Sequence, residues 1–158
     1  MLFSSGVSAA ADFDQVQALA DFESGTKAYY SKDYKTAIQL LLPLAELGLS
    51  QAQQYLGSMY SHGWGVLENN KTSLKWWTLS AKQGNWHAQG VVANHYITGE
   101  GAPADLVKAY MWFNLSHYNG SPIADMHKEQ ISKILTDVEL IKAQDMSSRC
   151  LESNYTDC

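Results

Sequence analysis

The sequence pattern of residues 52–84 recurs 36 residues further on in this chain, with no insertion or deletion between the two copies. A period of 20–50 residues is typical of proteins built from stacked structural repeats, so this offset constrains the fold before any helix or strand propensity is considered. The pairs that match at this offset include Ala52 and Ala88, Tyr60 and Tyr96, Gly63 and Gly99, Gly65 and Gly101, Trp76 and Trp112, Trp77 and Phe113, and Gly84 and Gly120.

Each copy has the pattern of two antiparallel helices. The first helix is predicted over 50–61 in one copy and over 86–98 in the other, and each ends at a Gly-x-Gly turn. Two glycines allow positive φ and the close backbone approach that a tight reversal between helices requires. The second helix starts after a polar cap, which is Asn69 or Asn70 in the first copy and Asp105 in the second.

Helical spacing of apolar residues extends the pattern toward the N-terminus. Helices are predicted over 12–31 and 34–47, with Asp33 as the cap of the second and Pro43 bending it or removing one backbone bond. The apolar residues that define the first of these helices are Phe13, Val16, Ala20, Phe22 and Ala28.

The last forty or so residues lack the glycine turn and the tryptophan pair. Ser121-Pro122 has the form of a helix start, and Thr136 with Glu139 forms a capping box that opens a final helix. We expect this pair of helices to close the stack as a terminal cap. The residues expected to be buried are Ile123, Met126, Ile131, Ile134, Val138, Leu140, Ile141, Ala143 and Met146.

These elements predict one all-α domain over 12–158, an α-solenoid of about four helical hairpins. Its units are a degenerate repeat at 12–48, repeats at 50–84 and 86–120, and capping helices with a tail at 121–158. Residues 1–11 are interpreted as the remnant of a secretory leader, with Val7-Ser8-Ala9 near a cleavage site, or as a frayed N-terminus.

Two cysteines, Cys150 and Cys158, lie eight residues apart at the C-terminus. In an oxidising compartment a disulfide between them would contribute roughly 2.5 kcal/mol, and the alternative is two unrelated thiols. The disulfide and the leader together indicate export. No metal or other cofactor is expected: a zinc site lacks two further ligands near the cysteines, and His87 and His95 lie two helical turns apart. His62 and His117 have no evident carboxylate partner in the sequence.

Composition excludes several classes of protein. Hydrophobic residues make up 46% of the chain and charged residues 17%, which argues against a disordered or fibrous protein. The net charge of −5 argues against a nucleic-acid partner, because phosphate binding needs clustered Lys and Arg. No apolar run approaches the 18 residues or so of a membrane span.

The repeated unit resembles the Sel-1-like repeat, a relative of the tetratricopeptide repeat. The match covers 51–120 well, and 22–48 is similar to a degenerate first unit through Gly25, Asp33-Tyr34 and Ala37. The residues that carry the resemblance are Ala52, Leu56-Gly57, Met59-Tyr60, Gly63-x-Gly65-Val66 and Trp76-Trp77, then Ala88, Tyr96, Gly99-x-Gly101, Asp105, Lys108-Ala109 and Trp112-Phe113.

Two positions depart from the family pattern: Ala93 replaces a helix glycine, and Thr72-Ser73 replace Lys-Ala. The resemblance implies a right-handed α-solenoid that serves as a protein-binding scaffold. It also implies a bacterial periplasmic protein of the adaptor, regulator or immunity type, because exported members of the family have such roles.

The sequence contains only weak matches to known catalytic motifs. The Gly-x-Gly turns follow no strand and precede no Lys-Ser/Thr, so they are not phosphate loops. Ser24-Gly-Thr-Lys27 matches the S-x-x-K of penicillin-recognising enzymes and Lys71-Thr72-Ser73 faintly resembles K-T-G, but the S-D-N element is absent. A helix surface is the favoured interpretation of both stretches.

The repeated aromatic pairs are assigned to the contacts between stacked hairpins rather than to a ligand cage. Candidate binding residues are therefore the positions on the predicted concave face that differ between the copies. Trp64 either folds back on its hairpin or projects as an anchor for a partner. The complete candidate set is Tyr29, Gln54, Ser58, His62, Trp64, His87, Asn94 and Thr98.

The sequence thus favours a non-catalytic scaffold that holds a protein or peptide partner in a concave groove. An immunity-type inhibitor of an exported toxin or enzyme is the alternative, and a β-lactam-type hydrolase is a remote one. The sequence leaves the identity of the partner and the oligomeric state open.

Overall fold

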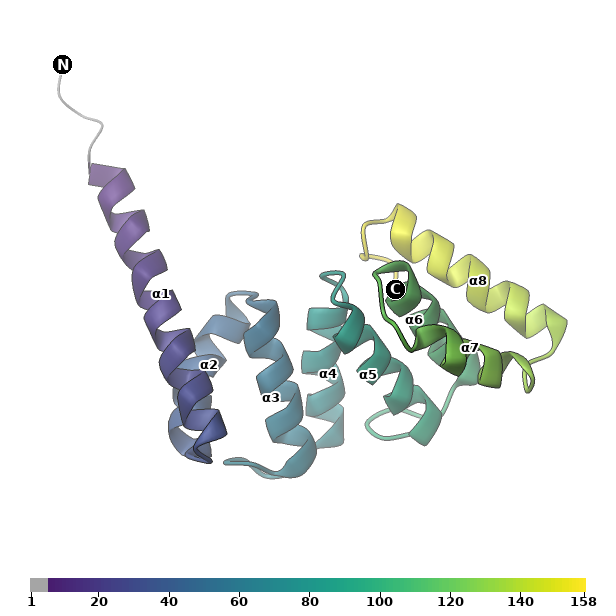
Figure 1. The fold of residues 1–158 in the computed structure, drawn as a ribbon, viewed down its shortest axis with the longest axis horizontal. Coiled ribbons are helices and arrows are strands. Elements are labelled where there is room, and N and C mark those ends of the chain that lie inside the picture. The colour runs from purple at the N-terminus through teal and green to yellow at the C-terminus, as the bar shows by residue number, and fades with distance from the viewer. Residues whose placement is uncertain (1–5) are drawn as a thin grey trace, which may run out of the picture.

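The computed structural model describes residues 6–158, with side chains from residue 14 onward. Within these residues every regular element is a helix, which confirms the predicted all-α class (Figure 1). The leader predicted at residues 1–11 lies outside the residues whose side chains are described. The helices are α1 (Gly6–Tyr30), α2 (Tyr34–Glu46), α3 (Ser50–His62), α4 (Asn70–Ala81), α5 (Trp86–Thr98), α6 (Leu106–Tyr118), α7 (Ala124–Ser132) and α8 (Asp137–Glu152).

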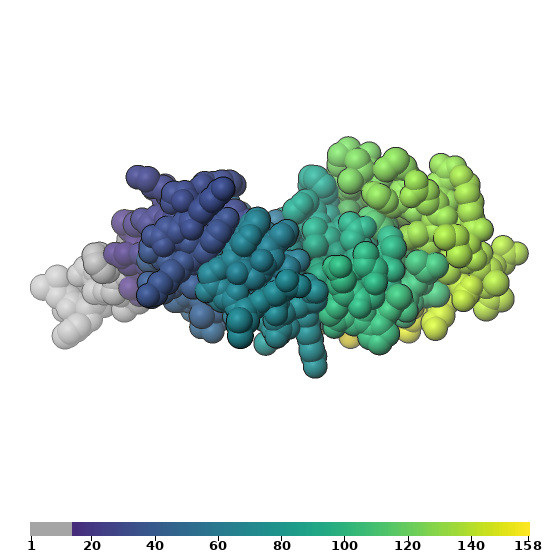
Figure 2. Space-filling model, turned by 90° about the horizontal axis from the view of Figure 1, so that it is seen from below, coloured from purple at the N-terminus to yellow at the C-terminus, as the bar shows by residue number. Residues whose placement is uncertain are grey.

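Consecutive helices pack against each other from α1 to α6, and both α7 and α8 pack against α6. The space-filling view shows the units following one another along the long axis of the molecule in chain order (Figure 2). This arrangement confirms the predicted solenoid of helical hairpins.

The caps of the second helices recur at the same 36-residue offset as the sequence repeat. The side chains of Asp33, Asn69 and Asp105 each accept a hydrogen bond from the backbone N–H three residues on, at 3.2, 2.9 and 3.0 Å. The cap of α4 is therefore Asn69 rather than Asn70. Because Asp33 keeps the register, the N-terminal hairpin is a true unit of the repeat.

Two buried glutamines also recur at this offset, and the sequence argument missed them. The Gln53 side-chain amide donates to the carbonyl oxygen of Ala45 at 3.0 Å, and Gln89 donates to that of Ala81 at 3.0 Å. Each bond joins the first helix of one hairpin to the end of the preceding hairpin. A buried amide with its partner fixed in this way sets the register of the stack, because an unpaired amide would be costly there.

The repeated aromatic residues lie in the core, as predicted. Trp76, Trp77, Trp112 and Phe113 are between 2% and 8% exposed. Trp76 belongs to the apolar cluster of the first hairpins, and Trp77 belongs to the cluster that continues to the C-terminal helices. Adjacent tryptophans on α4 thus pack into both halves of the solenoid, in agreement with their assignment to the contacts between stacked hairpins.

The departure at Ala93 has a packing explanation. A methyl group added to Gly57 would lie 2.6 Å from Nε1 of Trp77, so only glycine fits there. In the next copy the residue that corresponds to Trp77 is Phe113, whose ring is smaller, and the position that corresponds to Gly57 is alanine. The two substitutions compensate for each other in volume.

This pairing gives a testable prediction. Gly57→Ala is expected to lower the free energy of unfolding by about 1–3 kcal/mol, because the core has no room for the added methyl group. In a Trp77→Phe background the same change is expected to cost less than half as much. Urea denaturation of the four variants measures the coupling, and an equal loss in both backgrounds would show that Trp77 does not cause the requirement for glycine.

Helix α1 differs from the prediction in its length. It begins at Gly6 rather than residue 12 and has 25 residues, whereas its partner α2 has 13. Val16 is 65% exposed and Ala20 is also exposed, whereas Ala28 is buried, so of the apolar residues that predict this helix those nearer its C-terminal end are the packed ones. The N-terminal half of α1 extends beyond α2, as Figure 1 shows, and has no neighbouring helix to cover it.

The predicted start of the next helix at Ser121-Pro122 was also wrong. Helix α7 begins at Ala124, and its cap residue Ile123 makes no side-chain hydrogen bond. The N–H of Ser121 instead donates to the carbonyl oxygen of Ser116 at 2.9 Å, and Gly120 takes a φ of +95°. Ser121 therefore terminates α6 in a glycine-based C-cap and is not free to cap α7.

The C-terminal helices bury fewer residues than predicted. Ile131 and Ala143 are buried, and Leu140 and Met146 are half-buried. The exposed members of the predicted set are Ile123, Met126, Ile134, Val138 and Ile141. Both helices pack on α6, so each buries one narrow stripe, and among the described residues no other helix packs extensively against either of them.

The C-terminal tail is joined to α8 by a disulfide and to the last repeat by a hydrogen bond. Cys150 and Cys158 form the predicted disulfide. The Tyr155 hydroxyl is 2.8 Å from the side-chain nitrogen of Asn119, which in turn donates to Gln89 at 3.0 Å. The disulfide thus closes a loop, and Tyr155 in that loop joins the hydrogen-bond network of the buried Gln89 through Asn119.

Candidate functional site

The first helices of the hairpins, α1, α3 and α5, present the candidate residues on one face of the stack, which we call the helix-A face. Tyrosines gather where α1 meets α3. The rings of Tyr29 and Tyr55 are 4.8 Å apart, and the Tyr29 hydroxyl is 3.1 Å from the Ser58 hydroxyl. The Tyr30 hydroxyl lies 3.2 Å from that of Tyr55. This cluster offers aromatic surface and hydroxyl groups at one place, as peptide-binding surfaces do.

Tyr55 of the tyrosine cluster keeps its proton at physiological pH. Burial, together with the hydrogen bond to Tyr30, raises the pKa of Tyr55 to about 12. A phenol with a raised pKa keeps its proton, so Tyr55 can both donate and accept a hydrogen bond but cannot act as an anionic base. The cluster is thus built for contact rather than for proton transfer.

A pocket of about 400 Å3, which we call the tyrosine pocket, opens beside this cluster. Gln54 crosses it toward the next hairpin, and its side-chain oxygen lies 3.4 Å from Nδ1 of His87. The pocket therefore spans three hairpins and is not a feature of one unit. Its lining residues are Tyr29, Tyr30, Gln51, Gln54, Tyr55, Ser58, Trp77 and His87.

Trp64 does not project: it packs against His62 of its own hairpin and against Tyr29 and Tyr34 of the preceding hairpin. Its ring stacks on Tyr34 at 5.1 Å and on His62 at 4.3 Å, with interplanar angles of 7° and 19°. The ring of Tyr29 meets its edge at 5.8 Å. Trp64 and His62 therefore form the supporting wall of the tyrosine cluster.

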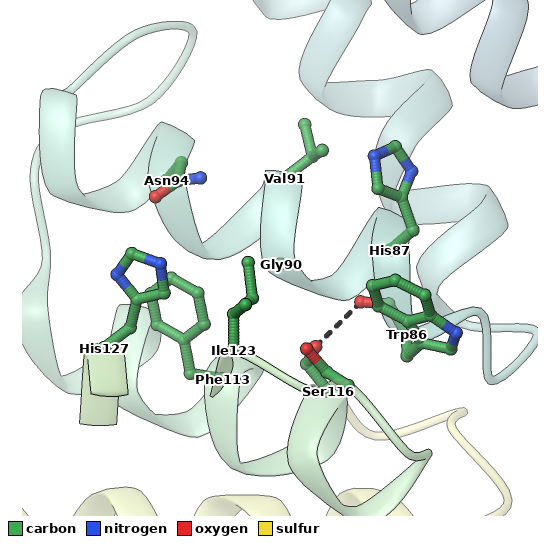
Figure 3. Close-up of a pocket in the computed structure, with 10 residues that line it drawn as sticks. Trp86, His87, Gly90, Val91, Asn94, Phe113, Ser116, Ile123 and His127 are labelled. Atoms are coloured by element: carbon green, nitrogen blue, oxygen red, sulfur yellow. Dashed lines mark hydrogen bonds between the residues drawn. The ribbon is translucent and has the colours of Figure 1, made fainter. Parts of the chain in front are cut away.

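A second pocket of about 150 Å3, which we call the Gly90 pocket, lies between α5 and the helices that follow it (Figure 3). His87 lines both this pocket and the tyrosine pocket, so the two adjoin on the helix-A face. Asn94 also lines it. The lining residues are Trp86, His87, Gly90, Val91, Asn94, Phe113, Ser116, Ser121, Ile123 and His127.

The structure thus brings most of the predicted site residues together. Tyr29, Gln54, Ser58 and His87 line the tyrosine pocket, and Asn94 lines the Gly90 pocket. Thr98 is separate: its hydroxyl donates to the carbonyl oxygen of Asn94 at 3.2 Å, and it lines neither pocket.

The sequence argument missed Tyr30, Gln51 and Tyr55, which line the tyrosine pocket. The signal was present for two of them. Gln51 and Tyr55 fall three residues before Gln54 and three before Ser58, at the spacing that places side chains on one face of a helix. Tyr30 lies in the last turn of α1 and is 74% exposed, and only the packing of α1 on α3 brings it to the pocket.

The other residues that were considered for catalysis or metal binding have structural roles. His95 is buried, with Nδ1 2.9 Å from the Glu100 carbonyl oxygen, so it does not share an exposed face with His87. The expectation that His117 lacks a carboxylate partner was wrong, because its Nδ1 is 3.0 Å from Asp125. The buried Ser73 hydroxyl donates to the Gly57 carbonyl oxygen at 2.8 Å. Among the described residues no three His, Cys, Asp or Glu side chains are placed to hold a metal ion.

A different groove, of about 570 Å3, runs along α4 and is lined by three lysines, Lys71, Lys75 and Lys82. Tyr96 forms part of its wall, and Nζ of Lys108 lies 5.2 Å from the centre of that ring. We call it the lysine groove. It is the principal alternative surface for a partner.

Comparison with known families and structures agrees with the repeat register. The Sel1 repeat matches three successive segments, residues 18–49, 50–85 and 86–121. No curated protein matches the chain closely enough to count as a relative. Among the helices of the described residues, none is long and apolar enough to cross a membrane.

Solved structures that share the fold include the following two. One is c5321, a protective antigen present in uropathogenic Escherichia coli strains and displaying an SLR fold, with 25% identity and a TM-score of 0.80 over 90% of this chain. The other is a Sel1 repeat protein from Oxalobacter formigenes, with 26% identity and a TM-score of 0.64 over 68% of this chain. The aligned region covers 32% and 44% of those two proteins, so both are much longer than this chain.

Proposed function

The chain belongs to the Sel1 repeat family, and from this premise we propose that it is a non-catalytic scaffold that holds a protein segment on its helix-A face. Sel1 repeat proteins are generally scaffolds for protein interaction. The observation that supports this particular face is the tyrosine pocket, where the exposed ring of Tyr30, the half-buried rings of Tyr29 and Tyr55, and the His87 side chain of the third hairpin converge. An extended segment can use such a surface through apolar contacts and through hydrogen bonds to its backbone.

The residues that differ between the two repeats lie on this face, which supports its assignment as the binding surface. Gln54, Ser58 and Tyr55 have Gly90, Asn94 and Val91 as their counterparts one repeat later, so the face changes in character along the stack. Core residues such as Ala52 and Ala88, or Trp76 and Trp112, keep their type at the same offset. A surface that varies on a conserved frame can distinguish one partner from another while the fold is kept.

A capture experiment with matched tyrosine variants tests this proposal. Tyr30 and Tyr118 are both exposed, at 74% and 69%, but only Tyr30 lines the tyrosine pocket. Tyr30→Ala is expected to weaken retention of the partner at least tenfold in a quantitative affinity capture, whereas Tyr118→Ala leaves it unchanged. Equal retention by the two variants would contradict the proposed surface.

The captured partner also separates the scaffold from the immunity-type inhibitor. An inhibitor would bind one exported enzyme or toxin and suppress its activity on binding, whereas a scaffold leaves the activity of its partner intact. The same capture, followed by an activity assay of the partner with and without this chain, distinguishes the two.

The proposal includes export to an oxidising compartment such as the bacterial periplasm. A disulfide between Cys150 and Cys158 persists in oxidising compartments and is rare in the cytosol. The tail that it closes contacts the glutamine network of the last repeat, so the oxidised form stabilises the end of the stack.

A further inference from the structure

Gly90 lies in the middle of α5 without a structural reason to be glycine. Its φ is not positive, and a methyl group added to it would meet only the hydroxyl of Ser116, at 3.8 Å. Gly25 and Gly57, the other helix-interior glycines whose surroundings are described, would each place that methyl group within 3 Å of a core side chain. Glycine is among the least favourable residues inside a helix, so its use at residue 90 calls for another explanation.

The missing side chain opens the Gly90 pocket. One repeat earlier the equivalent residue is Gln54, whose side chain extends from the helix toward His87. At Gly90 the corresponding space is empty and leads down to the rings and methyl groups of α6 and α7 (Figure 3). Glycine here creates a depression in a face that is otherwise covered by side chains.

The walls of this pocket set the chemistry of an occupant. Phe113 forms one wall with His127 stacked on it at 4.7 Å and 11°, and Ile123 and Trp86 supply further apolar surface. The Ser116 hydroxyl is already used, because it donates to the carbonyl oxygen of Trp86 at 2.8 Å. No Asp, Glu, Lys or Arg lines the pocket, so a cationic side chain would lose its hydration there without gaining a carboxylate partner.

The volume of the pocket limits the occupant to one side chain. An engineered protein cavity of about 150 Å3 lined by Leu, Ile and Phe binds benzene, and the Gly90 pocket has the same volume, about 150 Å3. A benzyl or isobutyl group is of this size. Because His87 lines both pockets, a segment lying on the tyrosine cluster would reach the Gly90 pocket within one repeat.

We propose that the Gly90 pocket is an anchor site for one uncharged aromatic or branched aliphatic side chain of the bound protein segment. This inference rests on the proposed function and adds the class of residue that the partner must carry. Buried apolar anchors of this kind supply most of the affinity at many interfaces. The exposed amide of Asn94 at the rim is placed to bond the backbone of the segment.

The test uses single-residue probes and two substitutions at one position. N-acetyl-phenylalaninamide and N-acetyl-leucinamide are titrated into the full chain, with N-acetyl-lysinamide as the control, and backbone amide shifts are followed by NMR. Wild type and Gly90→Ala are expected to show saturable shifts at residues 90, 116 and 127 with the apolar probes. Gly90→Leu, whose side chain fills the pocket, is expected to bind them at least tenfold more weakly.

Melting temperatures at or above that of the wild type are expected for Gly90→Ala and Gly90→Leu, since both residues favour a helix more than glycine does. Loss of probe binding in Gly90→Leu is then not a loss of fold. The absence of shifts at Gly90 with both apolar probes, or equal affinity in Gly90→Leu, would overturn the anchor site.

Partner capture separates this inference from the proposed function. Loss of the partner in both Tyr30→Ala and Gly90→Leu supports both claims. Loss in Tyr30→Ala with full retention in Gly90→Leu overturns the anchor site and leaves the helix-A face standing. Retention in Tyr30→Ala with loss in Gly90→Leu supports the anchor site and contradicts the role of the tyrosine pocket.

Discussion

Gly101→Ala is expected to lower the free energy of unfolding by about 3 kcal/mol or more. Gly101 has a φ of +81°, and the added methyl group would fall on the backbone carbonyl of Asn70, 2.7 Å from its carbon. The contact joins the turn of one repeat to the start of the second helix in the preceding repeat. Gly65 makes the same contact with the backbone of Tyr34 one repeat earlier, so the clash would separate stacked hairpins.

A second glycine separates backbone strain from the clash. Gly48 has a φ of +96°, but a methyl group added there has nothing within 4 Å. Gly48→Ala is therefore expected to cost only the strain of a left-handed backbone, about 1–2 kcal/mol. Urea denaturation measures both variants. If the two lose equal stability, the turn does not depend on close stacking against Asn70.

Trp112→Ala is expected to cost about 3–5 kcal/mol, because it removes the largest side chain from the centre of the C-terminal core. Trp112 is 2% exposed and belongs to the cluster that α7 and α8 complete. The cavity that it leaves adjoins the helices that end the stack, so we expect α7 and α8 to lose protection from hydrogen exchange as well. Denaturation and exchange of the same sample measure both effects.

Trp86 provides the matched control for this truncation. It has no counterpart among the repeated aromatic positions and is 39% exposed. Trp86→Ala is expected to lower stability by about 1 kcal/mol or less, because most surface substitutions have small effects. Retention of the wild-type melting temperature by Trp112→Ala would contradict the assignment of the repeated aromatic residues to the core.

The sequence predicted the parts of the fold that it repeats. Asn69 and Asp105 cap equivalent helices, and Trp76 and Trp112 are buried in the same register. Each of these positions has an equivalent in the other repeat, and the agreement between the two supports its assignment. The C-terminal helices have no copy, and there Ser121 was assigned to the wrong helix because a Ser-Pro start and a glycine C-cap use the same residues.

The sequence predicted which face of the stack carries the candidate site, but it did not predict the contacts and pockets on that face. Residues that differ between copies, such as Gln54 and Asn94, do line pockets on the helix-A face. The stacking of Trp64 between two rings and the space beside Gly90 depend on contacts between separate hairpins, which helical spacing alone does not specify. Gly90 is informative only once the structure shows that nothing fills its missing side chain.

The claim that the partner lies on the helix-A face is tested most directly by site-specific photo-crosslinking. A benzophenone side chain placed at Gln51, which is exposed and lines the tyrosine pocket, is compared with one at Lys75, which is exposed and lines the lysine groove. We predict a crosslinked complex from position 51 and none from position 75. A complex that forms from position 75 alone would place the partner along α4 and contradict the account.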